Sequence, residues 1–214
     1  MHHWLGGADH GLRFDGPEGS AYWLTEGFTV HFTRELLLRA GLVTPDEAAE
    51  DLRMRLERHA ASPLRDLANE AIVRKLGESP EARQAPRDRG MLYAAEVDAA
   101  VRAKSGGKRS LDELVLGLLE RVRASGRAAG EGGTNAAPLP AGTWRELVGA
   151  ELGPEAQARF DAEILRGEPI TPPAGAFGPC FKPEKKALPA PRSGTVTLWM
   201  RDPKAPASCA RRGT

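Results

Sequence analysis

The sequence predicts a mainly α-helical protein. Its 214 residues include 33 Ala and 24 Leu but 9 Val and 3 Ile, and branching at Cβ disfavours helices while it suits strands. Hydrophobic residues make up 41% of the chain, which is enough for the core of one substantial domain. We therefore expect one helical domain, with or without a small appendage.

Positive and negative charges nearly balance in this chain, which argues against partners that are recognised by net charge. The chain has 30 Lys and Arg against 29 Asp and Glu, so no overall field draws it to nucleic acid or to an anionic membrane. No apolar run approaches the ~20 residues that a membrane helix needs. We expect no nucleic-acid partner and no membrane span. The sequence leaves oligomeric state and localisation open.

Periodicity and capping residues predict helices through the first third of the chain. Apolar residues at helical spacing predict a helix over residues 22–40 that stops at Gly41. The run Thr44-Pro45-Asp46-Glu47 combines an N-cap, a proline at the first helical position and a glutamate at the third. It predicts a second helix over residues 45–59. A weaker pattern predicts a short helix within residues 64–76.

The middle of the chain predicts two further core-forming helices. Residues 79–89 are polar and contain prolines, so we expect a connection there. An Ala-rich helix then covers residues 90–104 and is stopped by Gly106-Gly107. Ser110-Leu111-Asp112-Glu113 is a capping box that opens the next helix. Residues 126–142 are rich in Gly, Ala and Pro without periodicity, which predicts a flexible linker.

The C-terminal part predicts short elements and a tail. Thr143-Trp144-Arg145-Glu146 caps one short helix and Pro154 opens another, whereas residues 195–200 are a candidate edge strand. From residue 182 onward there are eight Lys and Arg against two Asp and Glu. The Pro-rich setting favours a solvated tail over a nucleic-acid arm. We divide the chain into a helical part, residues 1–170, and a Pro-rich basic extension, residues 171–214, that is partly disordered.

The two cysteines do not identify a site. Cys180 and Cys209 have 28 residues between them and no companion Cys or His pair, so they form neither a C-x-x-C redox motif nor a structural zinc site. A single bridge in an exported protein is the alternative, and we do not expect it.

One segment carries a chemical signal. Residues 23–29 read Trp-Leu-Thr-Glu-Gly-Phe-Thr, and residues 2–4 read His-His-Trp. Together they resemble zinc metallopeptidases of the gluzincin type, in which one helix carries H-E-x-x-H followed by a Trp and a second carries the third zinc ligand in W-L-x-E-G-F-[TA]. The Gly-Gly-x-x-Ser-Leu-Asp run at residues 106–112 is similar to glycyl aminopeptidases. The resemblance covers roughly residues 1–170.

The resemblance implies a zinc-dependent aminopeptidase that hydrolyses peptides, a gluzincin whose helical C-terminal part is present here. It assigns the role of metal ligands to His2 and Glu26. Zinc in catalytic sites takes three protein ligands and a water. The first histidine and the general-base glutamate would lie upstream of Met1, so we expect an N-terminally truncated chain with no catalytic residue assigned and no activity of its own. Arg87 stands where related enzymes have an oxyanion-stabilising tyrosine, and Tyr93 does not replace it.

Two other readings remain open. The chain is alternatively a non-catalytic helical module, a pseudoenzyme that binds a peptide or protein partner. Nucleic-acid binding by the basic tail is a weaker idea, and it requires an affinity that falls steeply with salt. A truncated start would also leave the apolar face Leu24, Phe28 and Phe32 without its packing partner, so we expect exposed apolar surface there.

Overall fold

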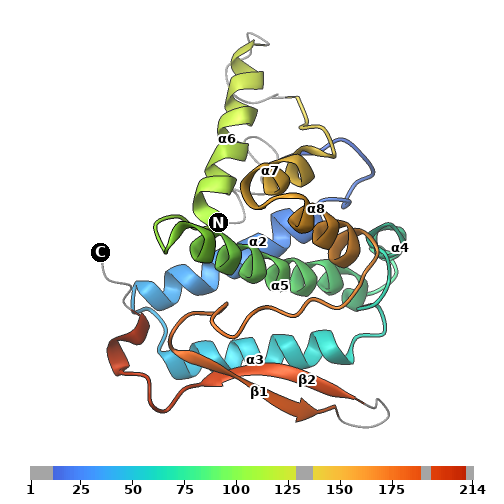
Figure 1. Ribbon diagram of the computed structural model, residues 1–214. Helices are drawn as coiled ribbons and strands as arrows, with labels where there is room; N and C mark the ends of the chain where they lie inside the picture. Colours follow the sequence, from blue (N-terminus) through green and yellow to red (C-terminus); the bar gives the residue numbers. More distant parts are fainter. Residues whose placement is uncertain (1–11, 129–136, 189–193, 211–214) are drawn as a thin grey trace.

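The computed structural model describes residues 12–128, 137–188 and 194–210. The fold is mainly helical, with one two-stranded sheet, which confirms the fold class (Figure 1). In chain order the elements are α2 (Tyr22–Arg39), α3 (Pro45–Ala61), α4 (Asn69–Lys75), α5 (Pro80–Ser105), α6 (Leu111–Ala128), α7 (Thr143–Leu152), α8 (Pro154–Phe160), the π-helical turn η1 (Asp161–Leu165), β1 (Phe181–Ala187), β2 (Thr195–Arg201) and the 3₁₀ turn η2 (Ala207–Ala210).

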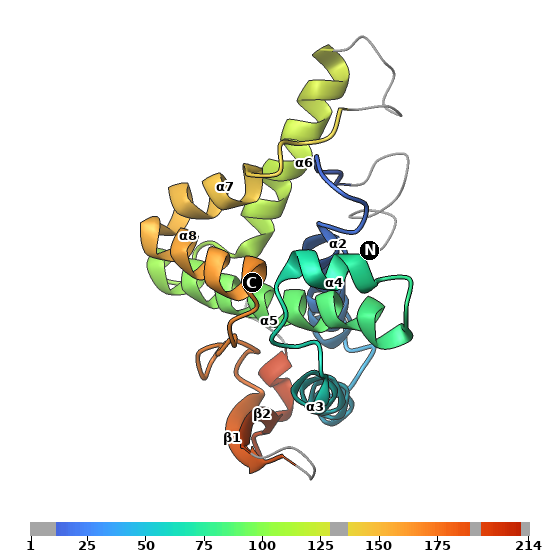
Figure 2. The same ribbon diagram turned by 90° about the vertical axis from the view of Figure 1, so that its right-hand side faces the viewer.

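Helix α5 is the centre of the arrangement. α2 crosses behind it, α7 and α8 lie above it, and α3 lies below it with the β1–β2 hairpin beneath (Figure 1). Figure 2 views α3 nearly along its axis and shows the hairpin beside it. Among the described residues, no helix is long and apolar enough to cross a membrane.

The apolar face of α2 is buried, contrary to the expectation of an exposed surface. Leu24 and Phe28 are completely buried, and Phe32 is 9% exposed. An aromatic cluster of Trp23, Tyr93, Trp144 and Phe160 covers this side of the helix, with ring centroids 5.2–6.4 Å apart. The expectation was wrong because helices later in the chain, α5, α7 and α8, supply the packing partners.

Helix α5 is longer than the sequence predicted. The Oγ of Ser79 accepts a hydrogen bond from the Ala82 N–H, Pro80 occupies the first turn, and Gly106 ends the helix at φ +63°. The predicted connection over residues 79–89 is therefore helical, with Pro86 inside it. Proline removes one backbone hydrogen bond, but Pro86 lies on a buried part of the helix. We attribute the helical state to tertiary packing that outweighs the local preference.

The predicted caps mostly hold. Thr44 and Glu47 form a complete capping box at α3, and at α6 the Glu113 carboxylate accepts from the Ser110 backbone N–H at 2.7 Å. Helix α4 is short and lies within the predicted range, and Pro154 opens α8 as predicted. At α7 the cap was wrong: Gly142 is the N-cap, with no side-chain cap bond.

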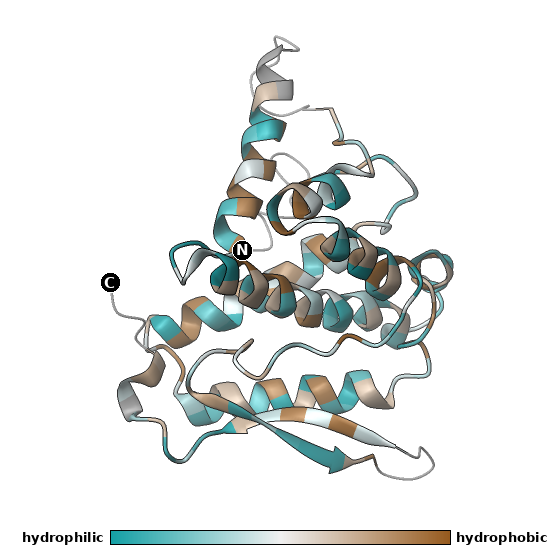
Figure 3. Cartoon of the chain, viewed as in Figure 1, coloured by the Kyte–Doolittle hydropathy of each residue, from teal (hydrophilic) through white to brown (hydrophobic). Residues whose placement is uncertain are grey.

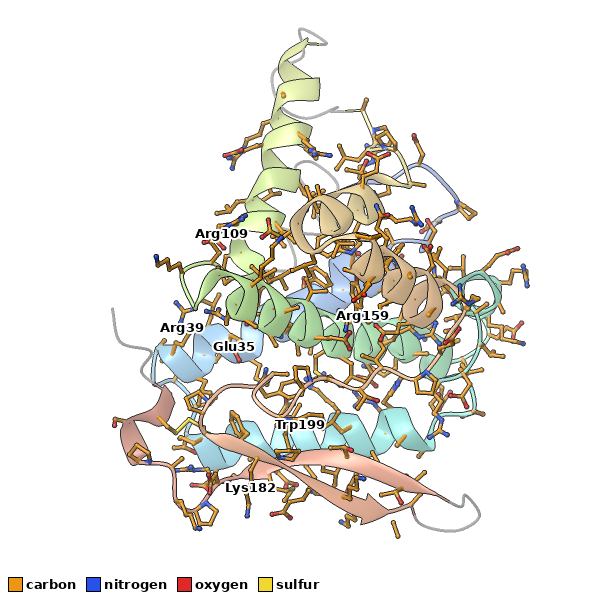
Figure 4. All side chains as sticks on the ribbon, in the orientation of Figure 1. Glu35, Arg39, Arg109, Arg159, Lys182 and Trp199 are labelled. Atoms are coloured by element: carbon orange, nitrogen blue, oxygen red, sulfur yellow. A yellow bond between two sulfur atoms is a disulfide. The ribbon has the colours of Figure 1, made fainter. Side chains whose placement is uncertain are left out.

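The described part of the C-terminal segment is folded, so the expectation of a solvated tail is wrong there. β1 pairs antiparallel with β2, the predicted strand, in a register that joins Phe181 to Arg201. Figure 3 shows hydrophobic positions along β2, whereas β1 is largely hydrophilic. Leu198 and Trp199 are each 1% exposed, and Trp199 lies between the hairpin and α3 (Figure 4). The division at residue 170 stays a prediction.

The two cysteines form a disulfide, contrary to the sequence-based expectation. Cys180 lies directly before β1, and Cys209 lies in η2, with 5.3 Å between their Cα atoms. Sequence patterns did not indicate this bond, because the pairing depends on β1, which was not predicted. A loop of this size constrains the unfolded chain and contributes on the order of 3 kcal/mol.

Candidate functional site

Two glycines bring α2 and α5 into backbone contact. A Cβ added at Gly27 would lie 2.5 Å from the Gly90 Cα, and one added at Gly90 would lie 1.7 Å from the Trp23 carbonyl oxygen. Real Cβ atoms do not approach other atoms so closely, so only glycine allows this crossing. The glycine in the Trp-Leu-Thr-Glu-Gly-Phe-Thr run thus has a structural reason, and Gly90 is its partner.

The crossing places Glu26 beside Arg87. Glu26 immediately precedes Gly27, and Arg87 lies three residues before Gly90. Their side chains form an ion pair, with 3.1 Å between Arg87 Nη2 and Glu26 Oε2. The Glu26 side chain is 15% exposed and that of Arg87 is 42% exposed. The structure therefore brings together the two positions that the resemblance assigned to a metal ligand and an oxyanion donor.

Tyr93 is a core residue. It is 2% exposed, and its hydroxyl accepts a hydrogen bond from Trp144 Nε1 at 3.2 Å. Burial raises its pKa above the ordinary value, the largest cause being loss of solvation. The expectation that Tyr93 does not replace the missing tyrosine agrees with this packing role.

The residues between Arg87 and Gly90 are fixed by partners that sequence reasoning missed. Asp88 is 2% exposed and pairs with Arg58 at 2.6 Å. Arg89, also 2% exposed, donates from Nη2 to the carbonyl oxygens of Arg65 and Leu67, at 2.6 Å each. Burial lowers the pKa of Arg89 to about 10. These contacts anchor the start of α5, and only the tertiary structure reveals them.

The described residues do not fit a zinc ion by themselves. His2 lies outside the described residues, so the structure does not test the pairing of His2 with Glu26. Within the described ranges no group of three or more His, Cys, Asp or Glu side chains is arranged to hold a metal ion. Glu26 is the one proposed ligand that can be placed, and its carboxylate faces the Arg87 cation.

A groove runs along the same side of α2 as Glu26. Helical spacing puts Glu26, Thr29, Val30, Thr33 and Leu37 on one face. The last four line a cavity of about 340 Å³ whose other wall is α3. The side chains on that wall are Glu47, Ala48, Asp51 and Arg55. The lining combines apolar side chains with charged ones, a combination that can receive a peptide.

The fold is helical, and its candidate site lies where α2, which carries Glu26, crosses α5. Residues 14–73 match the family model of M61 glycyl aminopeptidase. The matched segment contains α2 with Glu26, and also α3 and most of α4. It supports a peptidase family for this part of the chain. A search of curated proteins found no match.

Proposed function

We propose that residues 1–170 are the helical part of a zinc-metallopeptidase catalytic domain of the gluzincin type. In this proposal Glu26 stands at the third-ligand position, His2 stands at the second, and the complete enzyme removes amino acids from the N-termini of peptides. The observation that carries the proposal is the match of residues 14–73, which contain Glu26, to a glycyl aminopeptidase family model. The Gly27–Gly90 crossing sets this Glu26 beside Arg87, which lies outside the matched segment.

We further propose that the 214 residues alone do not hydrolyse peptides. His2 and Glu26 supply two ligands, whereas catalytic zinc sites take three from the protein. Within the described ranges no three His, Cys, Asp or Glu side chains are arranged to hold a metal ion. The ion pair with Arg87 adds to the mismatch. We therefore derive no catalytic step through zinc for this chain.

The test is an aminopeptidase assay on the purified 214-residue chain. We expect no release of glycine from glycyl-p-nitroanilide or from glycyl peptides, with or without added zinc. Zinc-dependent release that disappears in Glu26→Gln would contradict the proposal. Glu70→Gln is the matched control, because Glu70 is an exposed glutamate on α4, and this variant should behave as the unmodified chain does.

The groove beside Glu26 favours a second candidate function, a non-catalytic module that binds a peptide. Its apolar residues Val30 and Leu37 lie in the cavity between α2 and α3. If peptides bind there, Val30→Arg should weaken binding about tenfold or more, because a charge would enter a desolvated contact. Fluorescence anisotropy with labelled glycyl peptides measures this change.

The control for peptide binding is Leu42→Arg. Leu42 is 73% exposed and does not line the groove, so its replacement should leave affinity unchanged. Equal losses in both variants would argue against the groove as the binding surface. Stoichiometric zinc in the purified chain would count against a non-catalytic module.

A further inference from the structure

The ion pair between Glu26 and Arg87 is set by the backbone. Glu26 adjoins Gly27, Arg87 lies one helical turn before Gly90, and at these two glycines the backbones of α2 and α5 approach each other closely. The Glu26 carboxylate is the more enclosed partner, at 15% exposed against 42% for Arg87. The way the two helices cross therefore brings these side chains together. The ion pair does not depend only on the rotamer that an exposed side chain happens to adopt.

A guanidinium at this carboxylate opposes a divalent cation. The guanidinium group of arginine carries a positive charge in proteins. A metal ion bound to Glu26 would lie within a few ångströms of that charge, and the repulsion grows as the surroundings exclude water. One carboxylate oxygen, Oε2, already faces Arg87 Nη2 at 3.1 Å. Among the described residues, the charge beside Glu26 thus disagrees with a metal site.

We propose that Arg87 is the resident cation of the Glu26 carboxylate and stands where the resemblance to gluzincins puts a divalent metal ion. The inference rests on the proposed function for the assignment of Glu26 to the third-ligand position. It implies that an ion pair with Arg87 compensates the charge of the Glu26 carboxylate at the α2–α5 crossing, and that this carboxylate does not depend on zinc for it.

A double-mutant cycle on the full chain tests the proposal. Urea unfolding is measured for the unmodified chain, Glu26→Gln, Arg87→Gln and the double variant, each with EDTA and with added zinc. We expect the two side chains to be coupled by about three- to fivefold in the unfolding equilibrium constant. We also expect the curves of the unmodified chain with EDTA and with zinc to coincide.

The matched control is the ion pair between Glu70 and Arg74 on α4, whose side chains are 81% and 65% exposed. Its coupling should be less than about twofold, because exposed pairs gain little. Coupling between Glu26 and Arg87 that does not exceed this control would overturn the proposal. Stabilisation of the unmodified chain by zinc that is lost in Glu26→Gln would also overturn it.

The two proposals fail in different measurements. Failure of the proposed function would appear as zinc-dependent hydrolysis of glycyl peptides by the 214-residue chain. Failure of the ion-pair proposal would appear in the unfolding curves, whether or not any peptide is hydrolysed.

Discussion

Gly90→Ala is expected to lower the free energy of unfolding by about 3 kcal/mol or more, or to prevent folding. The added Cβ would lie 1.7 Å from the carbonyl oxygen of Trp23, and this oxygen belongs to the backbone of α2. A flexible side chain could move aside, but a helix backbone can yield only by separating α2 from α5. That separation would open the aromatic cluster around Trp23 and would move Glu26 away from Arg87. Thermal or urea unfolding monitored by circular dichroism measures the loss.

Gly117→Ala is the control for this prediction. Gly117 lies within α6, and a Cβ added there meets no atom within 4 Å. Because alanine is the better helix former, the control should be stabilised by about 0.5–1 kcal/mol. The same substitution should thus lower the free energy of unfolding at Gly90 and raise it at Gly117. A Gly90→Ala chain as stable as the unmodified one would mean that α2 and α5 do not meet at Gly27 and Gly90.

Local sequence signals predicted most of the helices. Where these signals failed, tertiary packing determined the structure. Thr44 with Glu47, and Ser110 with Glu113, marked helix starts that the structure confirms, because a cap is satisfied by residues three positions apart. Pro86 misled the prediction because the gain from burying the first turns of α5 is not visible in a short window of sequence. β1 was missed because its residues are mostly polar, and its pairing with β2 and the Cys180–Cys209 bond are both long-range.

The sequence identified the positions of the candidate site but did not predict the contacts between them. The Trp-Leu-Thr-Glu-Gly-Phe-Thr run singled out Glu26, and its alignment with a tyrosine position singled out Arg87. Nothing in the sequence said that the two would face each other at 3.1 Å, because that depends on the crossing of helices about 60 residues apart in the chain. Gly90 is the residue that could have indicated this contact, because a glycine inside a helix often marks a place where another backbone packs closely.

A buried carboxylate on η1 predicts a second large effect, on the pH dependence of stability. Glu163 is 7% exposed, and its Oε2 has no hydrogen-bond partner among the described residues. Loss of solvation, with the charge of nearby Glu96 as the next cause, raises the pKa of Glu163 to about 8. Arg159 lies on α8, facing α5, and its guanidinium is 3.7 Å from Glu96 (Figure 4). It offsets part of the effect.

The sign follows from where the proton is held. Between the ordinary glutamate pKa of 4.5 and about 8, the folded chain keeps a proton on Glu163 that the unfolded chain has lost. Stability therefore falls as the pH rises through this window and levels off above it, with a total loss from this group of at most roughly 5 kcal/mol. His59 acts in the opposite direction at lower pH, because burial lowers its pKa to about 4, so stability falls as the pH drops from 6.5 towards that value.

Glu163→Gln separates these two contributions, because His59 is present in both chains and cancels in the difference between them. Near pH 5 the variant and the unmodified chain should unfold at similar urea concentrations, since Glu163 is then protonated in the folded state and amide and acid are close in shape. At pH 9 the variant should be more stable by about 2–4 kcal/mol, the amide having no charge to bury. Glu70→Gln provides the comparison, because Glu70 carries an 81% exposed side chain on α4, and the stability of this variant should follow that of the unmodified chain at every pH. A difference between Glu163→Gln and the unmodified chain that stays constant from pH 5 to pH 9 would show that Glu163 is ionised in the folded protein, and hence that this carboxylate is solvated or paired.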